Sequence, residues 1–374
     1  MSDHGRVTLL SEFPLAITLI TAVLFWAFGS AWLADLSRTA WIAFLGAWLF
    51  VVVLIAAFGV VRHADALAVH LGEPLGTLVL TLSVISIEVM MISAVMLTGG
   101  NNPTLARDTM YSVAMIVLSA LVGLCLLLGG LRHREQEYNL QGANAFLGVI
   151  MPLAVLALIM PRYTRSTPSA TYSELQASLL VVMALGLYAT FLAVQTVRHR
   201  SFFVDPHRNA HGVESDPHAH NGVTAWPPAA HAAMLAGYLL PVVLLSKKLA
   251  IPVDYGMEQL GAPPALAGMV VATLVLSPEA FGAIRAALDN KLQRAINIAL
   301  GSVAATIGLT VPAVLAISVM THEPVVLGLE LPEAILLVLT LAVSMITFNS
   351  GRTNVLQGAV HMLLFFTYLM LIFD

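Results

Sequence analysis

The sequence predicts an all-α polytopic membrane protein of about eleven transmembrane helices, with one extra N-terminal helix followed by a 5+5 inverted repeat. The first observation behind this prediction is composition: the 374 residues are 59% hydrophobic and 10% charged, with a mean hydropathy of +0.88. A soluble domain has about 25% charged residues, so this deficit indicates a chain embedded in lipid. The second observation is a series of apolar runs of spanning length. The third is a pair of similar segments far apart in the chain.

Eleven apolar runs are long enough to cross a bilayer, which takes about 20 mostly apolar residues in a helix. The first run is longer than the apolar part of a typical cleavable signal peptide, so we expect it to be retained as a helix. The runs cover residues 14–34, 41–61, 75–97, 106–130, 140–160, 175–197, 228–249, 262–285, 292–319, 331–348 and 353–373.

One long polar connection, residues 198–227, divides the runs into two groups and predicts a linker. We therefore expect four parts: an N-terminal segment with the extra helix (1–40), a five-helix half (41–197), the linker (198–227) and a second five-helix half (228–374). Placing the N-terminus in the cytoplasm puts eleven Lys and Arg residues inside and six outside. Because cytoplasmic loops are rich in Lys and Arg, this count predicts a cytoplasmic N-terminus and linker.

The two similar segments read "LGEPLGTLVLTLSVISIEV" and "LGAPPALAGMVVATLVLSPEA". Each opens with Leu-Gly-x-Pro and reaches Ser-x-Glu inside a spanning run, at Glu88 and Glu279. The next runs also begin alike, with Arg107 in "LARDTMYS" and Arg294 in "LQRAINIA". The glutamates lie on the third and eighth runs, so the two copies point in opposite directions, as in many secondary transporters. The repeat segments cover residues 71–130 and 260–319.

Glu88 and Glu279 are costly residues for a membrane interior and therefore mark candidate ion sites. Two carboxylates on inverted helices could form one site near the midplane, where a hard cation such as Ca²⁺ takes about six to eight oxygen ligands. Without a cation both carboxylates favour protonation, so cation and proton would compete. The alternative is that each glutamate forms a buried ion pair or caps a kink. Further candidate oxygens come from Ser83, Ser86, Ser112, Thr273, Ser277, Asn297, Ser302, Thr306 and the carbonyls near residue 274, released by Pro278.

Four stretches carry a likeness to a known family: residues 61–96, 105–117, 274–312 and 350–370, the last reading "SGRTNVLQGAVHMLLFFTYLM". They resemble the calcium/cation antiporter superfamily, on its cation/proton exchanger branch. The resemblance implies eleven helices with two inverted repeats. It also implies antiport of Ca²⁺, and of Na⁺ or K⁺, for H⁺ across the inner (plasma) membrane.

The same resemblance assigns residues. The acids of the family's Gly-Asn-x-x-Glu-like motifs map onto Glu88 and Glu279, although "SVISIE" and "VLSPE" lack the Gly-Asn pair. "GSVAATIGLT" resembles the polar segment of the second repeat's partner helix and supports Ser302 as a site-lining residue. "GRTNVLQG" resembles a signature of the last helix, in which we expect Arg352 and Asn354 to bond to helix ends.

The linker holds His207, His211, His218 and His220 together with Asp205, Glu214 and Asp216. Loops of this kind are linked with regulation in the superfamily, so these residues form a candidate regulatory metal site. Their irregular spacing equally fits a solvated linker, whose polar residues only keep it in water. Both interpretations stay open at this point.

Two other function classes remain as alternatives to an antiporter: a passive cation channel and a membrane-embedded enzyme. The sequence contains neither a His-Glu-x-x-His zinc pair nor a Gly-x-Ser-x-Gly nucleophile elbow, so we do not expect an enzyme. The single cysteine, Cys125, excludes an internal disulfide and a Cys-based zinc site. The expected partners are inorganic cations, protons and the lipid bilayer, with no cofactor and no nucleic acid.

Overall fold

The computed structural model describes residues 12–72, 75–96, 104–167, 170–206, 226–263, 265–321 and 325–373. Within these ranges ten helices are long and apolar enough to cross a membrane, and Leu331–Thr347 is a shorter apolar helix. Each of the eleven predicted runs therefore corresponds to a helix in the described residues, which confirms the all-α fold class. The helices pack as two compact units.

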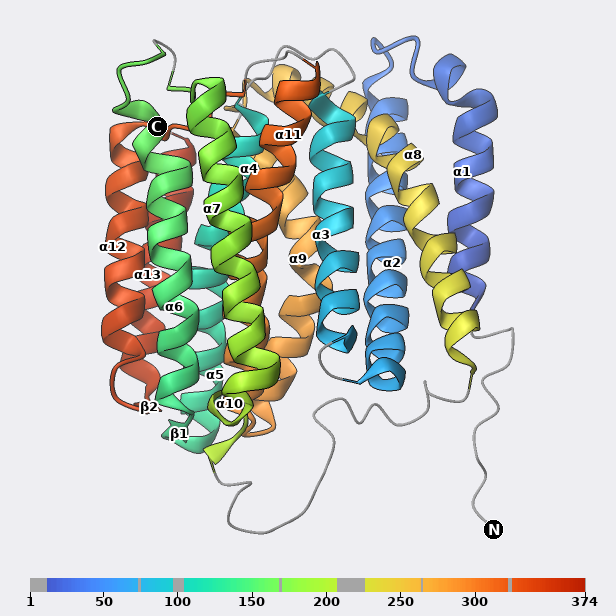
Figure 1. Cartoon of the computed structure of the whole chain (residues 1–374). Coiled ribbons are helices and arrows are strands. Elements are labelled where there is room, and N and C mark those ends of the chain that lie inside the picture. Colours follow the sequence, from blue (N-terminus) through green and yellow to red (C-terminus); the bar gives the residue numbers. More distant parts are fainter. Residues whose placement is uncertain are drawn as a thin grey trace, which may run out of the picture. The chain divides into compact units, whose positions relative to one another are not determined.

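The first unit is built from three consecutive helices and one from the second half of the chain. These are α1 (Phe13–Trp32), α2 (Thr39–Leu71), α3 (Leu75–Met96) and α8 (Pro228–Leu260). α2 packs against the other three, and α8 runs obliquely to it (Figure 1). Gly59 of α2 faces the ring of Tyr238 of α8, where a Cβ atom would lie 2.5 Å from the ring carbons. Glycine at this position therefore allows the two helices to approach closely.

Helices α2 and α8 extend well beyond the predicted runs 41–61 and 228–249. α2 continues past Arg62 to end before Gly72, which has a φ of 62°. α8 continues through Pro252 and ends before Gly261, which has a left-handed conformation that suits glycine. A charge or a proline ends an apolar run, but the helix continues where the polar side chain finds a partner, as Arg62 does with Glu12 at 2.6 Å.

The second unit contains the remaining helices, several of which pass through π-helical segments without a break. Its helical elements are α4 (Leu105–Met115), η2 (π, Ile116–Leu121), α5 (Val122–His133), α6 (Leu140–Ala154), η3 (π, Val155–Ile159), η4 (3₁₀, Met160–Arg162), α7 (Glu174–Ala193), η5 (π, Val194–Arg198), η6 (3₁₀, Arg200–Phe203), α9 (Ala265–Leu288), α10 (Leu292–Ala305), η9 (π, Thr306–Thr310), α11 (Val311–Thr321), α12 (Leu331–Thr347) and α13 (Val355–Ile372). The rods α4–η2–α5 and α10–η9–α11 each correspond to a single predicted run.

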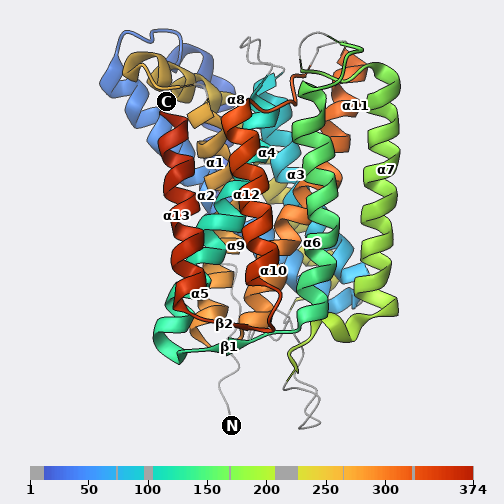
Figure 2. The same cartoon turned by 90° about the vertical axis from the view of Figure 1, so that its left-hand side faces the viewer.

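A short antiparallel pair, β1 (Gln136–Glu137) and β2 (Arg352–Thr353), joins the lower ends of α5, α6, α12 and α13 in Figure 2. Asn354 caps α13, since its Oδ1 accepts from the backbone N–H groups of Leu356 at 3.0 Å and Gln357 at 3.4 Å. The predicted role of Asn354 at a helix end is thus confirmed. The prediction for Arg352 is wrong, because its guanidinium pairs with Glu137 of the facing strand at 2.7 Å.

Candidate functional site

Glu88 lies in the middle part of α3, and its side chain is buried with only 2% exposure. Two candidate ligands precede it on the same helix. Ser83 donates its hydroxyl hydrogen to the Val79 carbonyl at 2.7 Å, and Ser86 donates to the Leu82 carbonyl at 2.6 Å. Each hydroxyl therefore stays bonded to its own helix and keeps acceptor lone pairs for another partner.

Glu279 lies in α9, directly after Pro278, and its side chain is half-buried. The helix runs without interruption from Ala265 to Leu288. Pro278 has no N–H to give to the carbonyl of Leu274, so that carbonyl loses its usual helical donor. Ser277 donates to the Thr273 carbonyl at 2.6 Å, which repeats the pattern of the serines before Glu88.

The partner helices of the two repeats each contain a π-helical segment, η2 in the first copy and η9 in the second. Thr306 opens η9 and is 2% exposed. Ser119 lies within η2 and is fully buried. Both residues stand twelve positions after the arginine that begins the matched runs, so they are equivalent in the repeat. Such π segments are rare and often mark functional sites.

Thr306 was among the predicted ligands, whereas Ser119, which occupies the same place in the first copy, was not. The signal that could have found Ser119 was the alignment of Arg107 with Arg294, extended by twelve residues. Thr310, also fully buried and in η9, was missed as well. No local sequence pattern predicts a π segment, because such a segment differs from an α-helix only by one extra residue in a turn.

The other predicted ligands take part in hydrogen bonds between elements or stay partly accessible. Ser112 of α4 donates to the Asp108 carbonyl at 2.6 Å and lies 2.7 Å from the hydroxyl of Tyr368 on α13. The Asn297 amide accepts from Gln293 at 2.8 Å and donates to the Phe203 carbonyl at 2.7 Å, so it ties α10 to η6. Ser302 of α10 is half-buried, and Thr273 of α9 is exposed.

At the start of α4 an ion pair anchors the helix. Arg107 Nε donates to Asp108 Oδ1 at 2.8 Å, and the Arg107 Nη1 donates to the Gly328 carbonyl at 3.2 Å. Asp108 is 3% exposed and also accepts from Thr104 at 2.8 Å. This side of α4 packs against α9, where a Cβ on Gly268 would lie 2.6 Å from the backbone of Asp108. Two elements of the repeats, α4 and α9, are thereby held in close contact.

Among the described residues there is no group of three or more His, Cys, Asp or Glu side chains that could hold a metal ion. A cation bound through Glu88 or Glu279 would therefore need hydroxyl, carbonyl or water oxygens to complete its ligands, which is ordinary for hard cations. Glu88 belongs to the first unit and Glu279 to the second. The linker histidines His207, His211, His218 and His220 lie outside the described residues.

Comparison with known proteins gives three consistent findings. The sodium/calcium exchanger protein family matches residues 39–197 and 230–373. The sodium-potassium/proton antiporter ChaA of Escherichia coli (strain K12) is 44% identical over 86% of this chain and 86% of its own length. Two solved structures have the same fold: the Ca²⁺/H⁺ antiporter YfkE, with a TM-score of 0.72, 19% identity and 98% of each chain covered, and the H⁺/Ca²⁺ exchanger CAX, with a TM-score of 0.69, 15% identity, and 98% of this chain and 89% of that chain covered.

These matches confirm the expected fold of eleven helices with inverted repeats. The family match covers most of the chain, and the resemblance inferred from the motifs around Glu88 and Glu279 agrees with it. The chain therefore belongs to the sodium/calcium exchanger protein family.

Proposed function

We propose that this protein is a secondary antiporter that exchanges Ca²⁺, and also Na⁺ or K⁺, for H⁺, with Glu88 and Glu279 binding cation and protons in turn. The observation that carries the proposal is the burial of the Glu88 carboxylate, 2% exposed, in a spanning helix of an exchanger-family chain. The 44% identical relative is named a sodium-potassium/proton antiporter, which supports coupling to protons. The names of the fold neighbours, Ca²⁺/H⁺ antiporter and H⁺/Ca²⁺ exchanger, support Ca²⁺ as a substrate.

Coupling follows from the cost of leaving a carboxylate charged and empty inside the membrane. Removing an ion from water costs several kcal/mol unless another charge or a set of hydrogen bonds compensates it. Each glutamate is therefore stable when it binds a cation or a proton, and unstable when it binds neither. If access to the two membrane faces alternates only between loaded states, a proton gradient drives cation movement.

The neutral oxygens of the repeat helices complete this chemistry. Two carboxylates match the charge of one divalent cation, and hydroxyl oxygens such as those of Ser83 and Ser277 supply further ligands without adding charge. Because two interacting carboxylates titrate as a pair, we expect proton release to occur in coupled steps as the cation binds. The cation is the substrate in this scheme, and no cofactor is required.

We further propose that the chain lies in the inner (plasma) membrane with its N-terminus and linker in the cytoplasm. The support is the distribution of Lys and Arg, eleven against six, between the two sets of loops. A bias of this kind sets the orientation of most multi-pass proteins.

The test is cation-driven proton movement in proteoliposomes that contain the purified protein and an imposed pH gradient. Adding Ca²⁺, Na⁺ or K⁺ should collapse the gradient, and Glu88→Gln or Glu279→Gln should abolish this because a neutral amide binds neither a proton nor a cation strongly. The matched controls are Glu258→Gln in the first unit and Glu174→Gln in the second, where the same change affects exposed side chains. Both controls should exchange at the wild-type rate.

Two results would contradict the proposal. Wild-type exchange by either site variant would remove that glutamate from the mechanism. Cation flux that leaves the pH gradient intact would favour the passive channel instead.

A further inference from the structure

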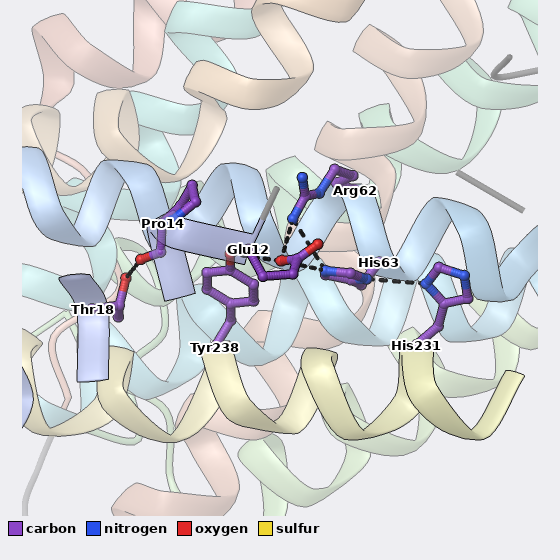
Figure 3. Close-up of polar contacts among 7 residues, drawn as sticks. All are labelled: Glu12, Pro14, Thr18, Arg62, His63, His231 and Tyr238. Atoms are coloured by element: carbon purple, nitrogen blue, oxygen red, sulfur yellow. Dashed lines mark hydrogen bonds and ion pairs between the residues drawn. The ribbon is translucent and has the colours of Figure 1, made fainter. Parts of the chain in front are cut away.

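The first unit contains a buried cluster of ionisable side chains that the antiport scheme does not use. His63 of α2 and His231 of α8 face each other, with 3.0 Å between their Nδ1 atoms. Each histidine is 1% exposed. On the other side of His63, its Nε2 atom lies 3.3 Å from a carboxylate oxygen of Glu12, the residue just before α1 (Figure 3). The cluster thus joins three segments of the chain.

Glu12 is held at this place by two further donors. Its Oε2 atom accepts from Arg62 at 2.6 Å and from the hydroxyl of Tyr238 at 3.2 Å. The Arg62 guanidinium also lies 3.2 Å from His63 Nε2. Glu12 and Arg62 neutralise each other, so the charge of the whole cluster depends on the two imidazoles.

The space between the Nδ1 atoms of His63 and His231 has room for one hydrogen atom. Two nitrogens 3.0 Å apart form a hydrogen bond only when one carries the hydrogen and the other accepts it. In the neutral pair, His63 either donates through Nδ1 and accepts from Arg62 through Nε2, or donates through Nε2 to Glu12 and accepts through Nδ1. The first arrangement uses the contact of Nε2 with Arg62 and the second uses its contact with Glu12, so the neutral pair can exist in two tautomers.

One additional proton can also be placed in this arrangement. His63 then carries hydrogens on both nitrogens, with Nε2–H directed at the Glu12 carboxylate and Nδ1–H directed at His231 Nδ1. A second proton does not fit, because it would place two N–H groups face to face across the same 3.0 Å. The His63 and His231 pair can therefore bind only one additional proton.

Among the described residues, the titratable groups around the pair come from the helices that pack against it. α2 contributes Arg62 and the exposed His70, which lies two turns after His63. The ring centre of His70 lies 5.8 Å from that of His231. Asp65, two residues from His63, projects from a different side of α2. α8 contributes Tyr238, α1 contains no ionisable residue, and the described part of α3 contains only Glu88. Trp226 lies beside both rings, with ring centres 6.5 Å from His63 and 6.2 Å from His231.

We propose that His63 and His231, with Glu12 as counter-ion, form a second proton-binding site that takes up a single proton and regulates exchange. Its ligand is H⁺, and the exposed His70 ring is the entry route. Protonation strengthens the hold of Glu12 on His63 and so fastens the start of α1 to α2 and α8. Both of these helices pack against α3, which carries Glu88. The regulatory part of this inference rests on the proposed antiport.

The first experiment counts protons and does not depend on transport. The full-length protein in detergent is titrated from pH 8 to pH 5, the range in which an ordinary histidine takes up its proton. Replacing the pair in His63→Gln/His231→Gln should reduce the uptake by one proton. The control is His133→Gln/His199→Gln. The His133 ring contacts the Leu288 carbonyl and the His199 ring contacts the Phe202 ring, so these histidines take no part in the pair. This control should leave the proton uptake of the His63 and His231 pair in place.

A reduction of two protons, or of none, for the His63 and His231 variant would overturn the shared-proton site. The single variant Glu12→Gln gives an independent reading if the double variant fails to fold. It keeps a hydrogen-bond acceptor but removes the counter-ion, so proton uptake by the pair should move to lower pH. Uptake at an unchanged pH would show that Glu12 has no part in binding the proton.

The second experiment measures exchange against pH in the proteoliposomes described above. The His63→Gln and wild-type rates should agree at pH 8, where the pair is neutral, and diverge below about pH 6.5, where an imidazole becomes protonated. Superimposed curves from pH 8 to 5 would exclude a regulatory role. If the wild type does not exchange at all, the antiport proposal fails, and the proton count still decides whether the site exists.

Discussion

Single hydroxyl groups on the repeat helices combine a structural and a chemical role. Ser83, Ser86 and Ser277 each donate to a carbonyl one turn earlier, at distances of 2.6 to 2.7 Å. Such bonds fix the side-chain rotamer within the helix while the oxygen remains able to accept or to coordinate. A serine of this kind can therefore serve as a neutral ligand near a buried glutamate without leaving an unsatisfied donor in lipid.

Replacing Thr306 by Val removes one buried hydroxyl from the π segment η9 and keeps the shape of the side chain. A hydrogen bond or contact to a charged group contributes about 1.5–3 kcal/mol, so the half-saturating cation concentration should rise about tenfold or more. The measurement is the initial rate of gradient collapse against cation concentration. Thr340→Val in α12 is the matched control, since Thr340 is fully buried but lies outside the repeat helices. An equal effect of both changes would argue against a ligand role for Thr306.

At the scale of helices, the π segments η2 and η9 are the clearest structural sign of the repeat. η2 and η9 interrupt equivalent rods, each within the partner helix that follows a glutamate-bearing helix. A π turn widens the helix by one residue, which redirects the side chains on either side of it. Ser119 and Thr306 are the residues whose equivalence shows that both copies use this device.

The contact between α4 and α9 depends on a glycine, and this can be measured. Gly268→Ala should lower the free energy of unfolding by about 1–3 kcal/mol, the usual cost of overpacking, because the new Cβ would meet backbone atoms of Asp108 that cannot move aside. The measurement is thermal unfolding in detergent.

Gly282→Ala on the same helix is the control, since its Cβ would meet only Ile298 Cδ1 at 3.7 Å. It should be neutral or slightly stabilising, because alanine has the higher helix propensity. Equal destabilisation by both changes would show that propensity and not the close contact decides the outcome.

At the scale of the whole molecule, each compact unit combines helices from both halves of the sequence. The first unit takes α1, α2 and α3 from one half and α8 from the other. Interleaving of this kind is expected for inverted repeats, whose copies pack with each other and not as separate domains. The helix α1, which precedes the repeat, is part of the same unit as the glutamate-bearing α3.

The orientation of the molecule in the membrane can be tested with a membrane-impermeant thiol reagent. Cys125 is buried, so Cys125→Ser provides a background without the native thiol. Asp289→Cys and Ser166→Cys introduce thiols at exposed positions in two different loops. The proposed topology places residue 289 in the cytoplasm and residue 166 outside, because of the Lys and Arg distribution. The reagent should therefore label Ser166→Cys in whole cells and Asp289→Cys only in everted vesicles, and the reverse pattern would contradict the orientation.

The sequence alone determined which segments cross the membrane, that they are helical, and that two of them are inverted copies bearing Glu88 and Glu279. It could do so because lipid leaves the backbone no hydrogen-bond partners, so a spanning segment must be an apolar helix and hydropathy along the chain reveals it. Hydropathy ended two of the predicted helices too early, one at residue 61, just before Arg62, and the other at residue 249. There the helices continue, and polar groups find partners elsewhere in the fold, as Arg62 does with Glu12 and Tyr255 with the hydroxyl of Thr39.

Only the tertiary structure decided which polar side chains meet. His63 and His231 are 168 positions apart, and their contact depends on how α2 packs against α8. The position of Glu12 beside them likewise depends on helix packing. The alignment of Ser119 with Thr306 depends on a single extra residue in each π turn. Helix packing and π turns leave no periodic pattern in the sequence, whereas the apolar length of a spanning helix does.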